Sequence, residues 1–419
     1  MADPGQGRPA RGAPPAGGGR AAGGARRSRG APPSARGVAL RSLVEVERGA
    51  RANEVVPALL DRSGLAGRDR HLVTELVYGS CRMRRAADWL VDRHLRGKAD
   101  PQVRCALRLG AYQLAWTRVP AHAAVSETVA EVEGPARGLV NAVLRKVAAD
   151  LRGGPPQWPD VATELSYPSW VVDRLTADLG AGDALGALRA MNSGRAVTIR
   201  DDGYAQDPAS QMVAAHLAAL AGGGLAVDLC AAPGGKATAL ASAGMEVVAA
   251  ELSKERTSVL AANARRLGHR QVAPVTADGT APPLRGGCAD LVLVDAPCSG
   301  LGVLGRRPDA RWRSRPGDVE RLAALQRRLL AAAGGLVRPG GILAYSVCTL
   351  TKAETAGVDR WLAAAAAELV PLPPPAAPWR PAGRGALLLP QAQGTDGMFL
   401  LVLRRRGGTP GRGEPPGSR

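Results

Sequence analysis

The spacing of apolar residues divides the chain into two parts of different character. Residues 37–150 place apolar side chains three and four positions apart, as in "DRHLVTELVYGSCRMRRAADWLVDRHL", and no alternating strand pattern intervenes. This spacing predicts a wholly helical domain. Residues 151–204 follow as a linker, "GGPPQWPD", and a short helical segment from Trp170 to Met191.

From about residue 205 the pattern changes to short apolar runs that alternate with helical stretches. The runs include "LAVDLC", "MEVVAAE", "ADLVLVD" and "GILAYS". This alternation predicts a βαβ repeat, in which a parallel sheet carries helices on both faces. Near the end, "GALLLP" and "MFLLVL" predict two final strands that form a closing hairpin. We therefore predict an α/β domain over residues 205–403.

The net charge of the chain indicates its class of partner. The formal net charge is +18 and the sequence pI is about 10.7, which is typical of proteins that meet nucleic acid. Residues 1–36 hold seven arginines against one acid, and residues 404–419 hold five against one. Both segments lack an apolar period, so we predict basic tails that attract RNA, the first of them disordered.

Cysteine usage and hydropathy narrow the setting. The six cysteines form no C-x-x-C pair and no Cys/His metal spacing, which indicates free thiols, a reducing compartment and no metal. No run of about eighteen apolar residues exists, and residues 1–36 lack the apolar segment of a secretory signal. The expected location is the cytoplasm, with no membrane partner.

A glycine-rich turn after the first predicted strand is the first candidate site. "VDLCAAPGGKATALA" (227–241) is neither a P-loop nor G-x-G-x-x-G, but such a turn lets a ligand approach the backbone at a helix start. Glu251 ends the second strand and Asp278 the third. An acid at the second strand suits ribose hydroxyls, and Asp278 suits an adenine amine. Together these features predict a nucleoside pocket.

Two cysteines follow later strands of the same sheet. Cys298 lies in "DAPCSG" after Asp295, and Cys348 lies in "AYSVCTLTKAE". Because ligands bind beyond the carboxyl ends of such strands, we expect both thiols to lie close together near the glycine-rich turn. Thr351 and Glu354 are spaced as a capping box, so a helix start is expected to favour the Cys348 thiolate. Either cysteine alone is as easily a small buried side chain.

An arginine-rich stretch, "GRRPDARWRSRPG" (305–317), follows the Cys298 loop. Arginines beside a tryptophan are suited to holding phosphates and stacked bases. A solvated basic loop is an equal alternative. The candidate RNA contacts are Arg306, Arg307, Arg311 and Arg313.

These motifs resemble those of the RNA (cytosine-C5)-methyltransferases of the bacterial Sun/Fmu (RsmB) type, which modify 16S ribosomal RNA. "DLCAAPGGK", "DAPCSG" and "SVCT" match three motifs of that family, and "LVYGSCR" and "GLVNAVLRKV" resemble its NusB-like RNA-binding domain. The resemblance implies a Rossmann-like sheet that binds S-adenosylmethionine. Cys348 is then the nucleophile and Cys298 the thiol for product release, with Asp295 and Lys236 beside them. The cofactor contacts would be Cys230, Ala231, Ala232, Pro233, Gly234, Gly235, Lys236, Glu251, Arg256, Asp278 and Asp295.

The resemblance departs from the family pattern at one place and leaves alternatives open. A small subdomain normally separates a "TIR"-like strand from "QDPAS", but here only Asp201–Ala205 lie between them. We expect a monomer that methylates 16S ribosomal RNA. The alternatives are the same reaction on tRNA, an RNA-binding protein with an idle methyltransferase domain, and a small-molecule methyltransferase.

Overall fold

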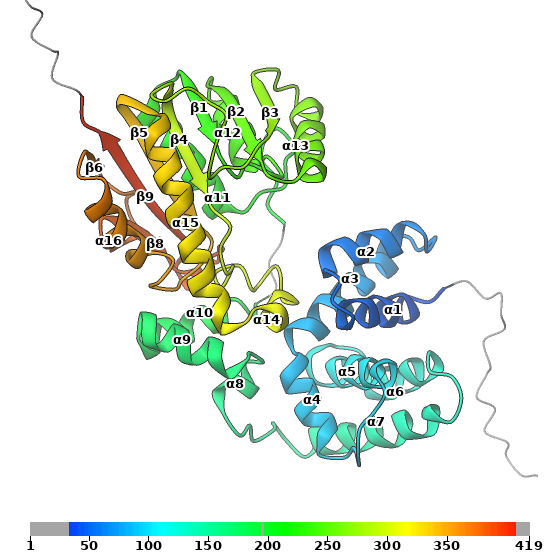
Figure 1. Cartoon of the computed structure of the whole chain (residues 1–419). Helices are drawn as coiled ribbons and strands as arrows, with labels where there is room; N and C mark the ends of the chain where they lie inside the picture. The colour runs from blue at the N-terminus through cyan, green and yellow to red at the C-terminus, as the bar shows by residue number, and fades with distance from the viewer. Residues whose placement is uncertain (1–32, 194–196, 408–419) are drawn as a thin grey trace, which may run out of the picture.

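The computed structural model describes residues 33–193 and 197–407. Most of both predicted tails therefore lies outside the described residues. The first helix begins at Ala35 and the last strand ends at Arg405, so each overlaps the predicted tail by two residues. Two bodies are visible in Figure 1, a helical one and a sheet-containing one, with helices α8–α10 along their border.

The N-terminal body is entirely helical, as its apolar spacing predicts. Its first helix starts at Ala35 because Ser34 accepts a hydrogen bond from the amide of Gly37. Asp100 caps α5 in the same way, with Pro101 at the first helical position. One buried core joins the helices, which are α1 (Ala35–Glu47), α2 (Ala52–Asp61), α3 (Gly67–Arg82), α4 (Arg84–Asp92), α5 (Pro101–Trp116), α6 (Ala121–Ala130) and α7 (Ala136–Arg152).

Three short helices connect the two bodies: α8 (Val161–Glu164), α9 (Ser169–Leu179) and α10 (Ala181–Ala190). Their apolar side chains form a separate core with Leu301, Leu304 and Leu350. Those three leucines flank the two predicted cysteine loops. The connecting helices therefore support the loops from below the sheet, rather than acting as a simple linker (Figure 1).

The C-terminal body is one mixed sheet in the order β3-β2-β1-β4-β5-β9-β8-β7. The first five strands in this order are parallel, as predicted, and β9 is antiparallel to both β5 and β8. The predicted final hairpin is therefore present, with β9 inserted into the sheet. The strands are β1 (Leu225–Asp228), β2 (Glu246–Glu251), β3 (Val272–Thr276), β4 (Ala289–Asp295), β5 (Val337–Val347), β6 (Leu369–Pro371), β7 (Arg380–Ala382), β8 (Gly385–Leu388) and β9 (Met398–Arg405).

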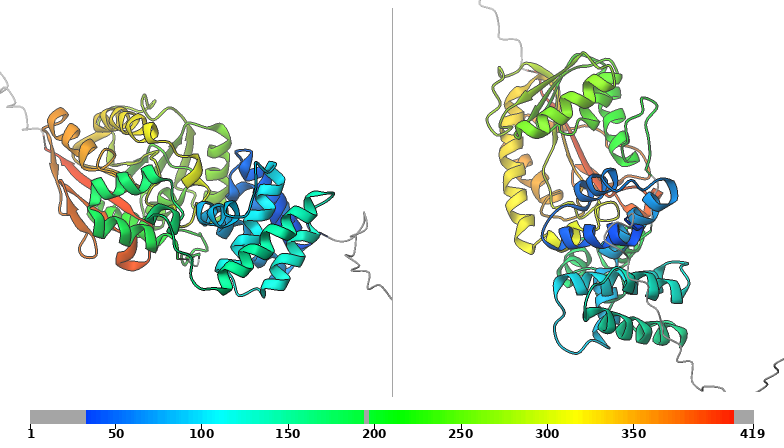
Figure 2. Two further views of the ribbon diagram at one scale, coloured as in Figure 1. Left: turned by 90° about the horizontal axis from the view of Figure 1, so that it is seen from below. Right: turned by 90° about the vertical axis from the view of Figure 1, so that its right-hand side faces the viewer.

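Helices cover both faces of this sheet. One face packs against α11 (Pro208–Ala221), α12 (Gly235–Ser242) and α13 (Lys254–Arg266), and the other against α15 (Pro316–Leu336) and α16 (Ala356–Ala365). Figure 2 shows these layers from two further directions. The short helices α14 (Ala310–Arg313) and α17 (Pro390–Gln393) lie in loops. No helix among the described residues is long and apolar enough to cross a membrane.

Candidate active site

The parallel strands place several polar side chains at one edge of the sheet. Asp228, Glu251 and Asp295 are the last residues of β1, β2 and β4, and β4 pairs with β5 so that Asp295 lies opposite Ser346. Cys348 follows β5 directly. Because all four strands run in the same direction, these residues lie at the edge that faces the helical body (Figure 1).

The two cysteines meet at this edge, which confirms their predicted proximity. The Sγ atoms of Cys298 and Cys348 are 3.3 Å apart. The pKa of Cys348 is lowered, first because Cys298 donates a hydrogen bond to its sulfur and then by the positive charges of Lys236 and Arg307. The same hydrogen bond and burial raise the pKa of Cys298. The Cys348 thiol therefore ionises more readily than the Cys298 thiol.

An ion pair lies beside the thiols. Lys236 is buried at the start of α12, and its Nζ is 2.7 Å from Oδ2 of the half-buried Asp295. Burial alone would lower the pKa of Lys236, but the Asp295 carboxylate outweighs it and the pKa is raised. Lys236 therefore stays charged beside the cysteine pair.

Glu354 joins the two cysteine loops, a role that its predicted capping box does not describe. Helix α16 begins at Ala356, so the prediction that Thr351 and Glu354 cap it is wrong. The Glu354 side chain is fully buried and turns inward. It accepts hydrogen bonds from the amide and hydroxyl of Ser299 and from Thr349, Thr351 and Gln326. The depressed pKa of Cys348 thus has its cause in neighbouring side chains rather than in a capped helix.

The glycine-rich loop is held in place through its backbone carbonyls. Arg256 donates to the carbonyl of Ala232 (2.6 Å), Asn263 to that of Pro233 (2.9 Å) and Arg200 to that of Gly235 (2.6 Å). Gly234 has a φ of 108°, a conformation that other residues rarely adopt. The side chains that hold the loop bind its carbonyl groups on one side, so the other side of the loop remains free to bind a ligand.

The acids around this loop differ in their burial and in their partners. Glu251 is buried and bridges the amide of Ser253 and the guanidinium of Arg256. Asp278 is exposed and accepts from the amide and hydroxyl of Thr280. Sequence analysis missed Asp228, a buried residue whose Oδ2 has no hydrogen-bond partner. Burial and then the Asp295 charge raise the pKa of Asp228 to about 7. A ligand amine would satisfy this orphaned oxygen.

The other cysteines lie away from this chemistry or are poorly ionised. Burial raises the pKa of Cys81 to about 12 and that of Cys105 to about 11, both in the helical body. The pKa of Cys230 is also raised, by burial and then by Asp228. Cys288 packs against the sheet core. Among the described residues, no group of three His, Cys, Asp or Glu could hold a metal ion.

The arginine-rich stretch is an interdomain contact, which corrects its predicted RNA-binding role at Arg311. Arg311 is fully buried and donates to the carbonyls of Arg82, Ser166, Met191 and Leu304. Those carbonyls belong to the helical body, the connecting segment and the Cys298 loop. With every face of the guanidinium engaged or buried, Arg311 has no surface to offer RNA.

Most of the neighbouring residues in this stretch also contact other groups of the protein. Arg306 pairs with both Asp207 and Asp396, at 2.9 Å each, and Arg313 pairs with the buried Asp309. Trp312 donates its indole N–H to the carbonyl of Cys81 in α3. Arg307 is exposed and is the member of the predicted set whose charge reaches Cys348. The arginine-rich sequence predicted an RNA contact at this loop, but most of these arginines bind other groups of the protein.

Comparisons with known proteins identify the family of the chain. Residues 216–404 match the family described as "16S rRNA methyltransferase RsmB/F", and residues 33–149 match the NusB family. The ribosomal RNA small subunit methyltransferase B of Thermus thermophilus is 38% identical to the chain, over 88% of this chain and 97% of that protein. The chain belongs to the RsmB/F family of 16S ribosomal RNA methyltransferases.

Further relatives of this RsmB/F methyltransferase extend over most of its length. A putative methyltransferase of Mycobacterium tuberculosis is 37% identical, over 85% of this chain and 93% of that protein. The crystal structure of PH0851 covers 90% of this chain and 99% of its own with a TM-score of 0.72; at 21% identity, this likeness shows a shared fold. The family resemblance read from the motifs is confirmed, and the cofactor of this methyltransferase is S-adenosylmethionine.

Proposed function

We propose that this RsmB/F methyltransferase transfers a methyl group to carbon 5 of a cytosine in 16S ribosomal RNA through a covalent cysteine adduct. The observation that carries the proposal is the cysteine pair, with 3.3 Å between its sulfur atoms, beside the Lys236–Asp295 ion pair. Carbon 5 of cytosine is a poor nucleophile, so methyl transfer to it needs prior activation of the ring. A single thiolate with a proton-bearing partner supplies that activation and its reversal.

In the proposed mechanism Cys348 adds to carbon 6 of the ring. The new S–C6 bond turns carbon 5 into an enamine-like nucleophile, and Asp295 holds a proton at N3 to stabilise the adduct. S-adenosylmethionine supplies an electrophilic methyl group when bound. As the adduct forms, Cys298 passes its proton through Asp295 to N3 and becomes a thiolate. After methyl transfer this thiolate accepts the C5 proton, directly or through water. The C5–C6 double bond then re-forms as the S–C6 bond breaks, N3 returns its proton to Asp295, and Cys348 is freed. A cytosine within a helix must first be unstacked.

The proposed cofactor contacts are the loop from Cys230 to Lys236 with Glu251, Arg256, Asp278 and Asp295. The buried, unpartnered oxygen of Asp228 joins them as the acceptor for the cationic amino-acid end. The net charge of +18 and the NusB match support RNA as substrate, rather than a small molecule. The reaction on tRNA is the second candidate, favoured only by the same cysteine pair.

Methyl transfer from labelled cofactor to 16S ribosomal RNA, to tRNA and to buffer alone tests the substrate. Label in 16S RNA only is expected, and label in no RNA would contradict the proposal. Cys298→Ala should leave a protein–RNA adduct that survives denaturation, whereas Cys348→Ala should form neither adduct nor product. An adduct in Cys348→Ala would exchange the roles of the two thiols.

A further inference from the structure

A basic groove lies at the outer edge of the sheet, away from the cysteine pair. It has a volume of about 540 Å³ and lies between α13 and β3. Lys254, Thr257, Ser258, Ala261 and Arg265 line it from one face of α13, because they recur at helical spacing. The alternating residues Val272, Pro274 and Thr276 line it from one face of β3, with Arg270 before the strand.

The groove carries cations that no carboxylate neutralises. Lys254, Arg265 and Arg270 are exposed, and within the described residues none of them forms an ion pair. No acidic residue lines the groove. The nearest acid along α13, Glu255, is exposed and takes its hydrogen bond from Ser253. The positive charges of these three side chains therefore act on the surrounding solvent and its ions, and not on carboxylates of the protein.

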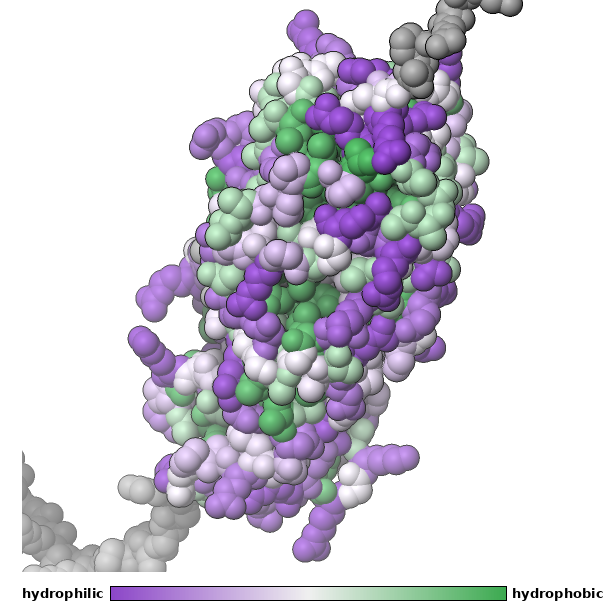
Figure 3. Space-filling view, turned by 90° about the vertical axis from the view of Figure 1, so that its left-hand side faces the viewer, coloured by the Kyte–Doolittle hydropathy of each residue, from purple (hydrophilic) through white to green (hydrophobic). Residues whose placement is uncertain are grey.

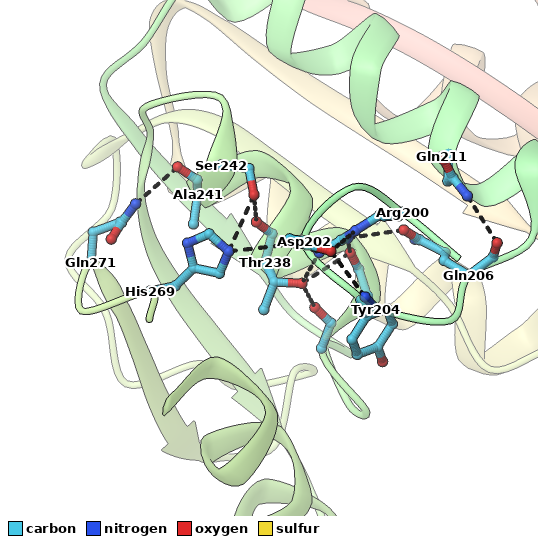
Figure 4. Close-up of polar contacts among 12 residues, drawn as sticks. Arg200, Asp202, Tyr204, Gln206, Gln211, Thr238, Ala241, Ser242, His269 and Gln271 are labelled. Carbon is cyan, nitrogen blue, oxygen red and sulfur yellow. Dashed lines mark hydrogen bonds and ion pairs between the residues drawn. The ribbon is translucent and has the colours of Figure 1, made fainter. Parts of the chain in front are cut away.

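A short hairpin lies beside one end of the groove, next to His269. Ile199 and Ala205 form its bridge, and Arg200 ties it to Thr238 and to the carbonyl of Gly235. Figure 4 shows His269 of the groove between Ser242 and Asp202, while Asp202 is held by Arg200. Arg200 therefore neutralises Asp202, and none of the described residues of the hairpin lines the groove.

The other end of the groove reaches the ligand edge of the sheet. Lys254 follows the end of β2 by three residues, and Thr276 is the last residue of β3. Figure 2 (right) faces the side of the molecule on which α13 and the first helices of the helical body both lie. A polyanion that enters the active site from the helical body can therefore continue along α13.

We propose that this groove binds the phosphate backbone of the RNA substrate through Lys254, Arg265 and Arg270. The inference rests on the proposed function and adds a second contact region, outside the catalytic cleft and the helical body. Phosphate contacts position RNA without reading its sequence. The groove therefore contributes to RNA affinity and to the register in which the RNA is bound, while the cysteine pair carries out the chemistry.

The test compares two triple variants of the full chain. In the first, Lys254, Arg265 and Arg270 become alanine. In the control, the exposed Arg360, Arg404 and Arg406 become alanine. Arg360 belongs to α16 and Arg404 to β9, and Arg406 follows that strand. Figure 3 shows the side of the molecule on which α16 and β9 lie. Filter binding of transcribed 16S ribosomal RNA and steady-state methyl transfer are measured over a range of salt concentrations.

The groove variant should bind this RNA about tenfold or more weakly, and its log K against log salt should flatten by about 2, since each lost contact removes about 0.7. The KM for RNA should rise while kcat at saturating RNA and the KM for cofactor stay unchanged. The variant Lys254→Arg, Arg265→Lys, Arg270→Lys should restore binding. The proposal is overturned if the RNA affinity is unchanged, which is the result expected if the groove binds a protein. It is also overturned if the control variant loses as much RNA affinity as the groove variant. A wild-type protein that transfers no methyl group contradicts the proposed function instead, because filter binding still reports on the groove.

Discussion

The arginine-rich loop at 305–313 and the groove between α13 and β3 are both basic, but their charges serve different purposes. In the loop, Arg306 and Arg313 are paired with carboxylates and Arg311 is buried among carbonyls. In the groove, Lys254 and Arg265 face solvent without a counterion in the described structure. A count of arginines in the sequence favours the loop, whereas the partners of each cation favour the groove. Availability, rather than the number of charges, decides which region can hold RNA.

The largest effect in this comparison is expected from Arg311→Ala. The change leaves four backbone carbonyls without their donor and opens a cavity at the junction of the two bodies. The free energy of unfolding should fall by about 3–5 kcal/mol. Urea unfolding measures this loss, and Arg360→Ala on the exposed face of α16 is the control, with an expected change below about 0.5 kcal/mol. A stable Arg311→Ala protein with weakened RNA binding would return the loop to an RNA-binding role.

The active site and the groove each contain a lysine, and the effects of replacing them on catalysis can be compared. Lys236→Met removes the cation that pairs with Asp295 and helps to lower the pKa of Cys348. We expect kcat at neutral pH to fall about a hundredfold, which corresponds to about 2.7 kcal/mol. The pKa of Cys348 should rise, so the acidic limb of the kcat/KM profile should move to higher pH because less thiolate is present at a given pH. Lys254→Met in the groove should leave that limb in place and raise the KM for RNA, so a shifted limb there would contradict the division of roles.

A large part of the fold was predictable because alternation and helical spacing are local signals. Strands ending at Asp228, Glu251 and Asp295 follow from apolar runs, and a parallel sheet then brings Cys298 and Cys348 to one edge. The insertion of β9 between β5 and β8 was not predictable, since the same apolar run suits an edge strand or a central one.

Glu354 and Asp228 were not predicted from the sequence as site residues, and the reason differs from that for β9. Glu354 has the spacing of a helix cap, and only the fold shows that its carboxylate turns inward to Ser299 and Gln326. Asp228 ends the first strand of the nucleotide-binding unit, a position that could have been noticed, but its orphaned oxygen is a property of packing. The partners of Arg311 are distant in sequence, so no local pattern predicts them.

A smaller effect is expected from Arg306→Ala, which leaves the buried Asp207 and Asp396 without their shared cation. The loss should be about 2–3 kcal/mol at neutral pH. Urea unfolding at neutral pH measures this loss. The exposed pair of Arg380 and Asp183 provides the control, since Arg380→Ala should cost less than about 1 kcal/mol. A loss in Arg306→Ala no larger than that in Arg380→Ala would exclude a structural role for the Arg306 ion pairs.

The smallest effect is expected from Arg307→Ala, and it tests whether any arginine of the loop resembles those of the groove. Arg307 is exposed, and its charge contributes less than Cys298 and Lys236 to the lowered pKa of Cys348. The acidic limb of the kcat/KM profile should therefore move to higher pH by less than in Lys236→Met, and the shift should diminish as salt screens the exposed charge. Arg307→Lys should preserve the profile. If Arg307→Ala instead raises the KM for RNA as strongly as the groove triple variant, with no change in the pH profile, then this one residue of the loop is a phosphate contact, and the boundary between the two regions lies within the loop.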